Sequence, residues 1–391
     1  MLNKDIFFNT NLKKKLNKNI KNAKKKFNFL KSDIKNFNTP LLNSFEKNYP
    51  FNFSEETIKK YSKYNNICII GIGGSILGTK AIYGFLNKKI KKNVFFFDNL
   101  DNKLLLKFKK NKKLHNSCFV IVSKSGNTLE TLTNLRLISS KKLLKNKIII
   151  ITELKNNKLI NMAKKYNAEV IEHKEFVGGR FSVLSEVGMF PAGLMNLKTT
   201  KFLNLKKLIN NKKFVSSLIN NVSCIYTFNQ LGIKNSVILN YDSELEDLCL
   251  WYQQLTAESL GKDGKGITPT ISTCPKDHHS LLQLYLDGPK DKFFTFFSSR
   301  SKKNSKLQST IDAQCESVKN IFKNKKIPYR HFIFKKNDEI ELGSTFLFFI
   351  LETILLAQLM KVNPYDQPAV QKIKEETKKI LSKYKFSKNY F

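Results

Sequence analysis

From about residue 66 onward, short runs of apolar residues alternate with longer amphipathic stretches. The apolar runs are rich in Val, Ile and Phe and have the length of β-strands, whereas the stretches between them have the length of helices. Strands that are apolar almost throughout are typical of parallel sheets, in which helices cover both faces. The first series therefore predicts a parallel α/β unit with strands at residues 66–72, 93–98, 117–123, 147–152 and 168–173.

A second series of the same kind follows residue 197. Helices are predicted at residues 202–231, 244–260 and 344–361, and a lysine-rich helix after Pro364 closes the chain. Two α/β units in tandem, with helical ends, are the simplest architecture for this pattern. The strands predicted in the second series lie at residues 236–241, 292–297 and 330–334.

The expected fold class is therefore α/β, with two tandem doubly wound parallel-sheet domains and helical N- and C-terminal extensions. In such sheets ligands bind at the carboxyl ends of strands, near the point where the strand order reverses. The polar, glycine-bearing stretches that follow strands are for this reason the candidate sites. The expected domains are a lysine-rich helical segment at 1–62, α/β domains at 63–197 and 198–363, and a helical tail at 364–391.

Composition favours a globular protein of the cytoplasm. Hydrophobic residues make up 41% of the 391 residues, which is enough to form buried cores. The six cysteines are dispersed and several lie in strand-like runs, so we expect buried, reduced thiols and no zinc site. The start of the chain lacks the apolar core of a signal peptide. The most apolar segment, residues 344–360, is short for a membrane span and contains Glu352, so we expect a buried helix and no membrane partner.

The formal net charge of +38 suggests a nucleic-acid or anionic-membrane partner at first sight. Only four of the basic residues are arginines, although base and phosphate recognition favours the guanidinium group. The lysines are dispersed among many Asn, Ile and Phe residues, a mixture that an AT-rich coding bias would produce. We therefore expect no specific nucleic-acid partner, although salt-sensitive binding to polyanions would follow from the charge alone.

A glycine-rich turn follows the first predicted strand, in the stretch "IIGIGGSILGTK". Glycines here would let the backbone approach an anion at the start of a helix, or would only allow a tightly packed turn. The stretch is not the dinucleotide fingerprint G-x-G-x-x-G, because Ile76 occupies the place of the third glycine. It is not a Walker A loop either, because Gly78 is followed by Thr79 before Lys80. ATP and NAD are therefore disfavoured as ligands.

The stretch "IVSKSGNTLET" turns abruptly from apolar to polar after the third predicted strand. Hydroxyl groups of Ser123, Ser125 and Thr128, with backbone donors around Gly126, can surround a compact dianion. Lys124 adds positive charge, and the helix that begins near Thr128 contributes its dipole. A single helix N-cap would need only one such residue, so a phosphate site is the favoured interpretation.

Three further stretches carry candidate chemistry. Arg180 follows two glycines and could face an anionic group in a cleft or form a surface ion pair. Glu258 ends a predicted helix and could act as a base if burial raises its basicity, although most helical glutamates are only solvated. His278 and His279 are adjacent, so at most one should face any site. No third His or Cys lies at ligand spacing, so we expect no metal.

Taken in order, "GIGGS", "SKSGNTLET", "GGRFSVLSEVG", "ESLGKDGKG" and "NPYDQPAVQKIK" resemble the phosphoglucose isomerase family, which is built on two sugar-isomerase (SIS) domains. The resemblance runs from about residue 66 to about residue 380. It implies the reversible isomerisation of glucose-6-phosphate and fructose-6-phosphate through a cis-enediol intermediate, in glycolysis and gluconeogenesis. It also implies two SIS-type domains and a reaction without cofactor or metal.

The resemblance implies a role for each matching residue. Glu258 matches the base that moves a proton between C2 and C1, and Arg180 matches the arginine that stabilises the enediolate. His279 matches the histidine that helps open the sugar ring, and Lys374 matches a lysine that assists at the ring oxygen. In the family this histidine comes from the partner subunit, so a homodimer with composite sites is implied. The implied substrate-binding residues are Gly74, Ser75, Ser123, Lys124, Ser125, Thr128, Gln254 and Gln367.

The chain departs from the family pattern in two ways and leaves two alternatives open. It is shorter than is usual for the family, and the segment "VQKIKEE" lacks a glycine that often precedes the final lysine, so Lys372 competes with Lys374 for that role. One alternative is a dual phosphoglucose/phosphomannose isomerase. The other is a non-catalytic SIS protein that senses sugar phosphates and binds nucleic acid through a basic surface.

Overall fold

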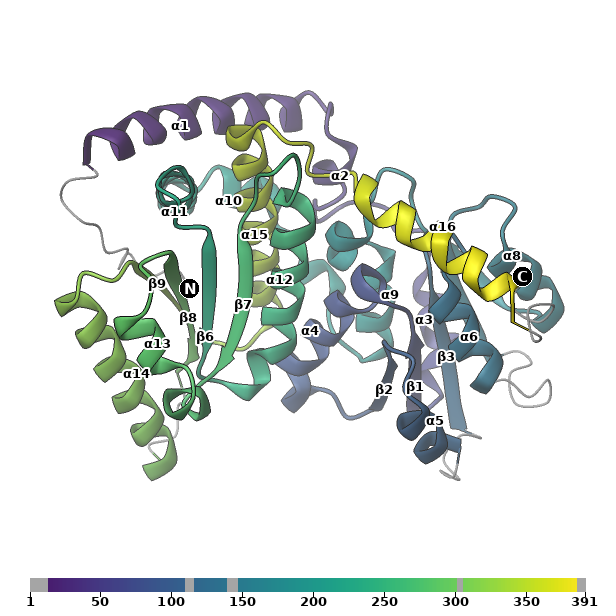
Figure 1. Cartoon of the computed structure of the whole chain (residues 1–391). Coiled ribbons are helices and arrows are strands. Elements are labelled where there is room, and N and C mark those ends of the chain that lie inside the picture. Colours follow the sequence, from purple (N-terminus) through teal and green to yellow (C-terminus); the bar gives the residue numbers. More distant parts are fainter. Residues whose placement is uncertain (1–12, 110–115, 139–146, 301–304, 385–391) are drawn as a thin grey trace. The chain divides into compact units, whose positions relative to one another are not determined.

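The computed structural model describes residues 13–109, 116–138, 147–300 and 305–384, which form two compact units (Figure 1). We name each unit after its sheet. The five-stranded unit comprises the described parts of Pro50–Lys80, Lys88–Leu197 and Tyr365–Phe391. The four-stranded unit comprises the described parts of Met1–Tyr49, Ala81–Asn87 and Lys198–Pro364.

All strands of the five-stranded sheet are parallel, in the order β2-β1-β3-β4-β5. Strands β1, β3 and β4 are buried at every residue, and for this reason each is an almost continuous apolar run in the sequence. The register pairs Ile70 of β1 with Ile121 of β3. The structure confirms the five predicted strands as β1 Asn66–Ile70, β2 Asn93–Phe97, β3 Ser117–Val122, β4 Ile148–Thr152 and β5 Glu169–Glu172.

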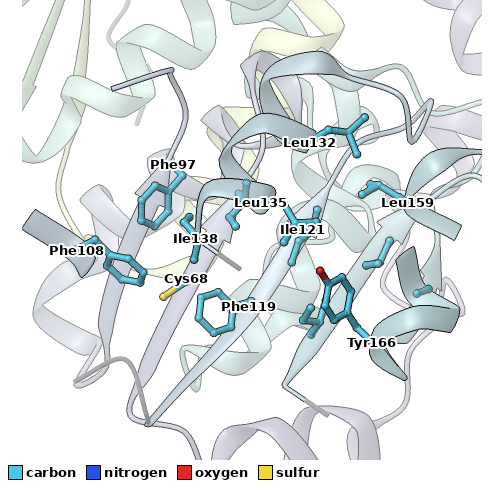
Figure 2. Packing of buried hydrophobic residues seen from close by; sticks show 14 of the residues in the cluster. Cys68, Phe97, Phe108, Phe119, Ile121, Leu132, Leu135, Ile138, Leu159 and Tyr166 are labelled. Atoms are coloured by element: carbon cyan, nitrogen blue, oxygen red, sulfur yellow. The ribbon is translucent and has the colours of Figure 1, made fainter. Parts of the chain in front are cut away.

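One face of this sheet carries a continuous hydrophobic core (Figure 2). Cys68 of β1 and Phe119 of β3 lie in it, together with Leu135 and Leu159 from covering helices. Asn157 begins the second of these helices by accepting the Ile160 N–H group at 3.0 Å. The helices of the unit are α3 Glu55–Ser62, α5 Asn102–Lys109, α6 Leu129–Ile138, α8 Lys158–Tyr166, α9 Glu186–Leu194 and α16 Pro368–Ser382, with short 3-10 helices η2 Gly73–Ser75, η3 Asn87–Lys89 and η5 Gly179–Leu184, and α4 Leu77–Leu86 continues from Lys80 into residues of the other unit.

The four-stranded sheet is also parallel, in the order β7-β6-β8-β9. Three of its strands confirm the sequence prediction: β6 Asn235–Asn240, β8 Lys292–Ser299 and β9 Tyr329–Phe334. Strand β7, Thr268–Thr273, was not predicted. It lies at the edge of the sheet, contains Pro269 and alternates between exposed and buried residues, so it lacks the apolar run that marks the inner strands.

Helices α12 and α15 of the four-stranded unit follow the prediction, whereas α14 was not predicted and the helix expected at 202–231 differs. The single helix expected at 202–231 is divided into α10 and α11, because Asn211 accepts the Phe214 N–H group at 3.0 Å and begins a new helix. The helices are α1 Lys13–Lys35, α2 Pro40–Asn43, α10 Leu205–Ile209, α11 Lys212–Gln230, α12 Glu246–Leu260, α13 Leu282–Asp287, α14 Lys306–Asn324 and α15 Glu339–Met360, with short 3-10 helices η6 Thr199–Lys201, η7 Ser243–Leu245 and η8 Lys276–His279.

Helix α15 is the apolar segment for which a membrane span was considered and a buried helix was predicted. By length and composition it could cross a membrane, but 94% of its most apolar 18-residue window is buried. Glu352 in its middle is fully buried and pairs with Arg330 of β9. The prediction of a buried helix is confirmed. All six cysteines are also buried and free, as expected.

Candidate functional site

In the five-stranded unit, the two predicted phosphate-binding stretches follow neighbouring strands. The chain passes from β1 to β2 on one side and later returns to place β3 on the other side, so the strand order reverses between β1 and β3. Gly74 and Ser75 lie in η2, directly after β1, and Ser123 directly follows β3. Both stretches therefore lie at the carboxyl ends of the strands that flank the reversal, where doubly wound sheets bind ligands.

A close backbone contact joins the β1 turn to the stretch that carries Arg180. A Cβ atom added to Gly74 would overlap the carbonyl carbon of Gly179 and lie 2.5 Å from the backbone nitrogen of Arg180. The Ser182 hydroxyl oxygen lies 2.7 Å from the Gly179 carbonyl oxygen and 3.2 Å from the Gly74 carbonyl oxygen, so it bridges the two turns. Glycine at position 74 thus lets η5 pack against η2 and brings Arg180 beside the β1 turn.

The turn after β3 gathers the predicted hydroxyl groups. Ser123 Oγ lies 2.7 Å from Thr128 Oγ1, and the buried Ser123 is thereby oriented by the residue that precedes α6. Ser125 Oγ accepts the Asn127 N–H group at 3.3 Å. Gly126 has a φ of +64°, and an added Cβ would overlap the side chain of Asn157. The turn therefore needs glycine at this position for both its conformation and its packing.

Lys124 lies in the same turn, but its ammonium group contacts a neighbouring loop. Lys124 Nζ donates to the Glu175 carbonyl oxygen at 2.7 Å and lies 3.8 Å from Glu153 Oε1. Burial lowers the pKa of Lys124, and the two glutamates oppose this effect. In this conformation the Lys124 ammonium group does not lie free for a phosphate, and Glu153 partly balances its charge. Lys124 can then act on an anion only through its backbone N–H group and its remaining positive field.

Arg180 is buried, with 2% of its surface exposed. Its Nη2 donates to the Asp366 carbonyl oxygen at 2.9 Å, and its guanidinium carbon lies 5.4 Å from the centre of the Phe181 ring. The burial argues against a solvated surface ion pair, which was the alternative left open by the sequence. Sequence reasoning gave no role to Asp366, because a backbone carbonyl leaves no residue-type signal.

The remaining predicted residues of this unit lie at the C-terminal helix. Gln367 is the residue before α16, and Lys374 lies within that helix. Both are exposed, and α16 contains no buried side chain over its described span, Pro368–Ser382. Lys372 is exposed on the same helix, so exposure does not distinguish it from Lys374.

In the four-stranded unit, α12 carries the predicted base. Gln254 and Glu258 are four residues apart, so they lie on the same side of the helix, and Gln254 Nε2 donates to Glu258 Oε2 at 3.0 Å. The other polar atom of this side chain, Gln254 Oε1, is buried and has no hydrogen-bond partner among the described residues. Gln254 therefore orients the Glu258 carboxylate, in addition to the substrate contact expected of it. The four-residue spacing was the signal that could have shown this.

The two adjacent histidines diverge as expected. His278 Nε2 lies 2.8 Å from the Tyr241 hydroxyl, its ring packs edge-on against the Tyr241 ring, and burial lowers its pKa. His279 is exposed at the end of η8. Of the two histidines, His279 is therefore the one whose ring is accessible to a ligand or to another protein chain.

The predicted residues are divided between the two units, and in the four-stranded unit Glu258 precedes strand β7 whereas His279 follows it. Arg180 and the hydroxyl-bearing turn belong to the five-stranded unit, and Gln254, Glu258 and His279 belong to the four-stranded unit. Within the described residues, no group of three or more His, Cys, Asp or Glu side chains could hold a metal ion.

Comparison with known proteins places this chain in a family. Residues 46–279 match the family model described as phosphoglucose isomerase. The chain is 35% identical over 354 residues to the glucose-6-phosphate isomerase of Methanocaldococcus jannaschii, covering 83% of this chain and 86% of that protein. It is 32% identical over 375 residues to the glucose-6-phosphate isomerase of Mycoplasmopsis synoviae, covering 84% and 86%.

Solved structures show the same fold. A hypothetical protein from Thermus thermophilus matches with a TM-score of 0.80 at 21% identity, covering 97% of this chain and 100% of that chain. A glucose-6-phosphate isomerase from Chlamydia trachomatis matches with a TM-score of 0.70 at 20% identity, covering 86% and 74%. At such low identity these likenesses concern the fold alone, whereas the sequence matches identify the family. The chain belongs to the phosphoglucose isomerase family.

Proposed function

We propose that the chain catalyses the reversible isomerisation of glucose-6-phosphate and fructose-6-phosphate. The observation that carries the proposal is the match of residues 46–279 to the family as one continuous segment. This segment contains both phosphate-binding stretches, Arg180, Gln254, Glu258 and His279. The activity belongs to glycolysis and gluconeogenesis, and we propose a cytoplasmic location for it.

The chemistry assigns one proton transfer to Glu258. In the open-chain aldose, the carboxylate removes the C2 proton, and the electron pair forms the double bond of a cis-enediolate. The Arg180 guanidinium stabilises the negative charge that develops on oxygen. A proton then passes from O2 to O1, Glu258 returns its proton to C1, and the electron pair of the C1–C2 double bond forms the new bond to that proton as C2 becomes the carbonyl carbon of the ketose. Because the hydrogen moves between adjacent carbons, substrate and product have the same oxidation level and no external electron acceptor is required.

The other residues bind the substrate and open its ring. Ser123, Thr128 and the backbone around Gly126 hold the phosphate, which orients the reacting carbons at the other end of the sugar. His279 and Lys374 act at the ring oxygen, where a proton must be delivered before the chain opens. We further propose a homodimer in which His279 of each subunit completes the site of the other.

A coupled assay tests the proposed activity. The full-length protein is given fructose-6-phosphate, and glucose-6-phosphate is detected by its dehydrogenase through reduction of NADP. We expect turnover that is unchanged after preincubation with excess EDTA and its removal. A mannose-6-phosphate arm shows whether the C2 epimer is also accepted. Absence of turnover by correctly folded protein would overturn the proposal.

A further inference from the structure

A buried hydrogen-bond network surrounds Arg330 in the four-stranded unit. Arg330 and Glu352 form a two-point ion pair, with Nη1 2.5 Å from Oε2 and Nη2 3.1 Å from Oε1. Arg330 Nε donates to Thr295 Oγ1 at 2.9 Å, and Nη1 donates to Asn221 Oδ1 at 3.1 Å. Nη2 also donates to the Tyr252 hydroxyl at 2.8 Å.

This network is closed to ligands. A guanidinium group has five N–H donors, and the five bonds from Arg330 use all of them. The exposed fractions of Arg330, Glu352 and Tyr252 are 4%, 0% and 2%. Burial alone would lower the pKa of Arg330, but the ion pair with Glu352 raises it on balance. Arg330 is therefore a permanently charged structural group, although it is one of only four arginines in the chain.

Tyr252 connects this network to the helix that carries the predicted base. Its hydroxyl accepts from Arg330 and donates to Glu352 Oε1 at 3.1 Å, and its ring lies 4.2 Å from the Phe349 ring between centres. Both hydrogen bonds are directional, so they fix the position of the Tyr252 side chain on β9 and α15. Tyr252 is in α12, six residues before Glu258.

Helix geometry places the Tyr252 side chain on a different side of α12 from the side chains of Gln254 and Glu258. At 3.6 residues per turn, Gln254 lies about 200° and Glu258 about 240° around the helix from Tyr252. A small roll of α12 about its axis would therefore move the Glu258 carboxylate sideways by a similar angle. Ring packing against Phe349 also resists this roll, and the two hydrogen bonds of the Tyr252 hydroxyl add directional contacts to it.

We propose that Tyr252 is a positioning residue that fixes the roll of α12 through its hydrogen bonds to Arg330 and Glu352, and thereby aims the Glu258 carboxylate. This inference rests on the proposed function, in which Glu258 moves a proton between C2 and C1. Positional accuracy matters for such a transfer, since a displacement of about 1 Å can lower a rate by about 100-fold.

The proton transfer supplies a readout that loss of stability would not change. While the proton is on Glu258 it is either delivered to C1 or exchanged with solvent. In D₂O, the deuterium content of the product measures the competition between these two steps. If the carboxylate is displaced from C1, delivery slows relative to exchange, and the deuterium content per turnover rises.

The test compares Tyr252→Phe with Thr295→Val in the full-length protein. Tyr252→Phe removes only the hydroxyl and keeps the ring packing. Thr295→Val removes a hydrogen bond to the same guanidinium from β8, so it perturbs the network without touching α12. For Tyr252→Phe we expect kcat to fall about 10-fold with a nearly constant KM and a higher deuterium content. Thr295→Val should lower the thermal midpoint but leave kcat and the deuterium content at wild-type values.

Equal deuterium contents in wild type and Tyr252→Phe would overturn the inference, as would an equal rise in both variants. If Tyr252→Phe does not fold, Glu352→Asp keeps the negative charge beside Arg330 but shortens the side chain that accepts from the Tyr252 hydroxyl, and it should raise the deuterium content in the same direction; an unchanged content would then refute the inference. Glu258→Gln separates the two hypotheses. If it retains wild-type kcat, the assignment of the base is wrong, whereas its inactivity beside an unaffected Tyr252→Phe removes the positioning role alone.

Discussion

At the scale of single residues, the contact between Ser123 and Thr128 links local structure to binding. Their hydroxyl oxygens lie 2.7 Å apart at the end of β3, so one hydroxyl donates to the other, and the second keeps its proton for a ligand in an orientation that this bond restricts. Preorganised donors bind an anion at a lower entropic cost than freely rotating ones. The phosphate does not take part in bond breaking, so its binding energy is used to hold the sugar in both ground state and transition state.

Replacing these hydroxyls should therefore affect substrate binding more than turnover. For Ser123→Ala and Thr128→Ala we expect KM for fructose-6-phosphate to rise by about 10- to 100-fold, because one variant removes a hydrogen bond to the charged phosphate, which contributes roughly 1.5–3 kcal/mol, and the other removes the bond that orients this donor. The kcat value should change by less than about threefold. Steady-state kinetics in the coupled assay measure both. An unaltered KM in both variants would show that the phosphate binds elsewhere.

The sequence predicted which residues are candidates better than it predicted the burial and the hydrogen-bond partners of those residues. Ser123 and Thr128 were identified as candidates from residue type and from their position relative to predicted strands and helices, whereas the role of Glu258 is implied by the resemblance to the family. Whether Arg180 was a surface ion pair or a buried group stayed open, because burial depends on tertiary contacts with η2 and Asp366. The network of Arg330 was missed altogether, since its members are separated by up to 131 positions along the chain, from Asn221 to Glu352.

At the scale of elements, the packing of η5 against η2 decides where Arg180 lies. A side chain at position 74 would overlap the backbone of Gly179, and backbone atoms cannot move aside as a flexible side chain can. Gly74 is therefore required by a contact between two turns. Overpacking at such a point costs about 1–3 kcal/mol and displaces the elements it joins.

Gly74→Ala should separate the β1 turn from the stretch that carries Arg180. We expect a lower thermal midpoint and a fall in kcat/KM of about 100-fold, because both phosphate binding and enediolate stabilisation depend on this contact. Calorimetry and the coupled assay provide the two measurements. Gly232→Ala is the control: Gly232 has a φ of +81°, but an added Cβ meets no described atom within 4 Å. It should destabilise through backbone strain without changing kcat/KM, and a kinetic loss equal to that of Gly74→Ala would refute the contact argument.

The elements themselves were largely predictable, and the misses have physical causes. Hydrophobic runs mark strands that are buried on both faces, so β1, β3 and β4 were visible in the sequence. The edge strand β7 alternates in exposure and has no such run. The break between α10 and α11 follows from the cap at Asn211, a local hydrogen bond that competes with helix continuation.

At the scale of the whole molecule, the proposed dimer assigns Glu258 and His279 of one site to different subunits. Consider a mixed dimer in which one subunit lacks Glu258 and the other lacks His279. Both defects then fall in the same site, and the second site is intact. The two sites of a closed twofold dimer are identical, so each intact site contributes the same activity. The recovered activity is therefore proportional to the fraction of mixed dimers.

Mixing Glu258→Gln with His279→Ala should therefore restore activity. After subunit exchange, half of the dimers are mixed and each has one intact site of two, so we expect about one quarter of wild-type activity. Each variant alone, incubated in the same way, provides the control. No recovery despite demonstrated subunit exchange would show that both residues act within one subunit, and a monomeric protein in sedimentation would exclude the dimer.

The central claim is that one carboxylate, Glu258, moves the proton between the two reacting carbons. Its most direct test is the steady-state kinetics of Glu258→Gln, which keeps the shape of the side chain and its bond to Gln254 while removing the basic oxygen. The account predicts a fall in kcat of about 10² to 10⁴-fold with KM nearly unchanged. A wild-type kcat, or a loss confined to KM, would contradict it.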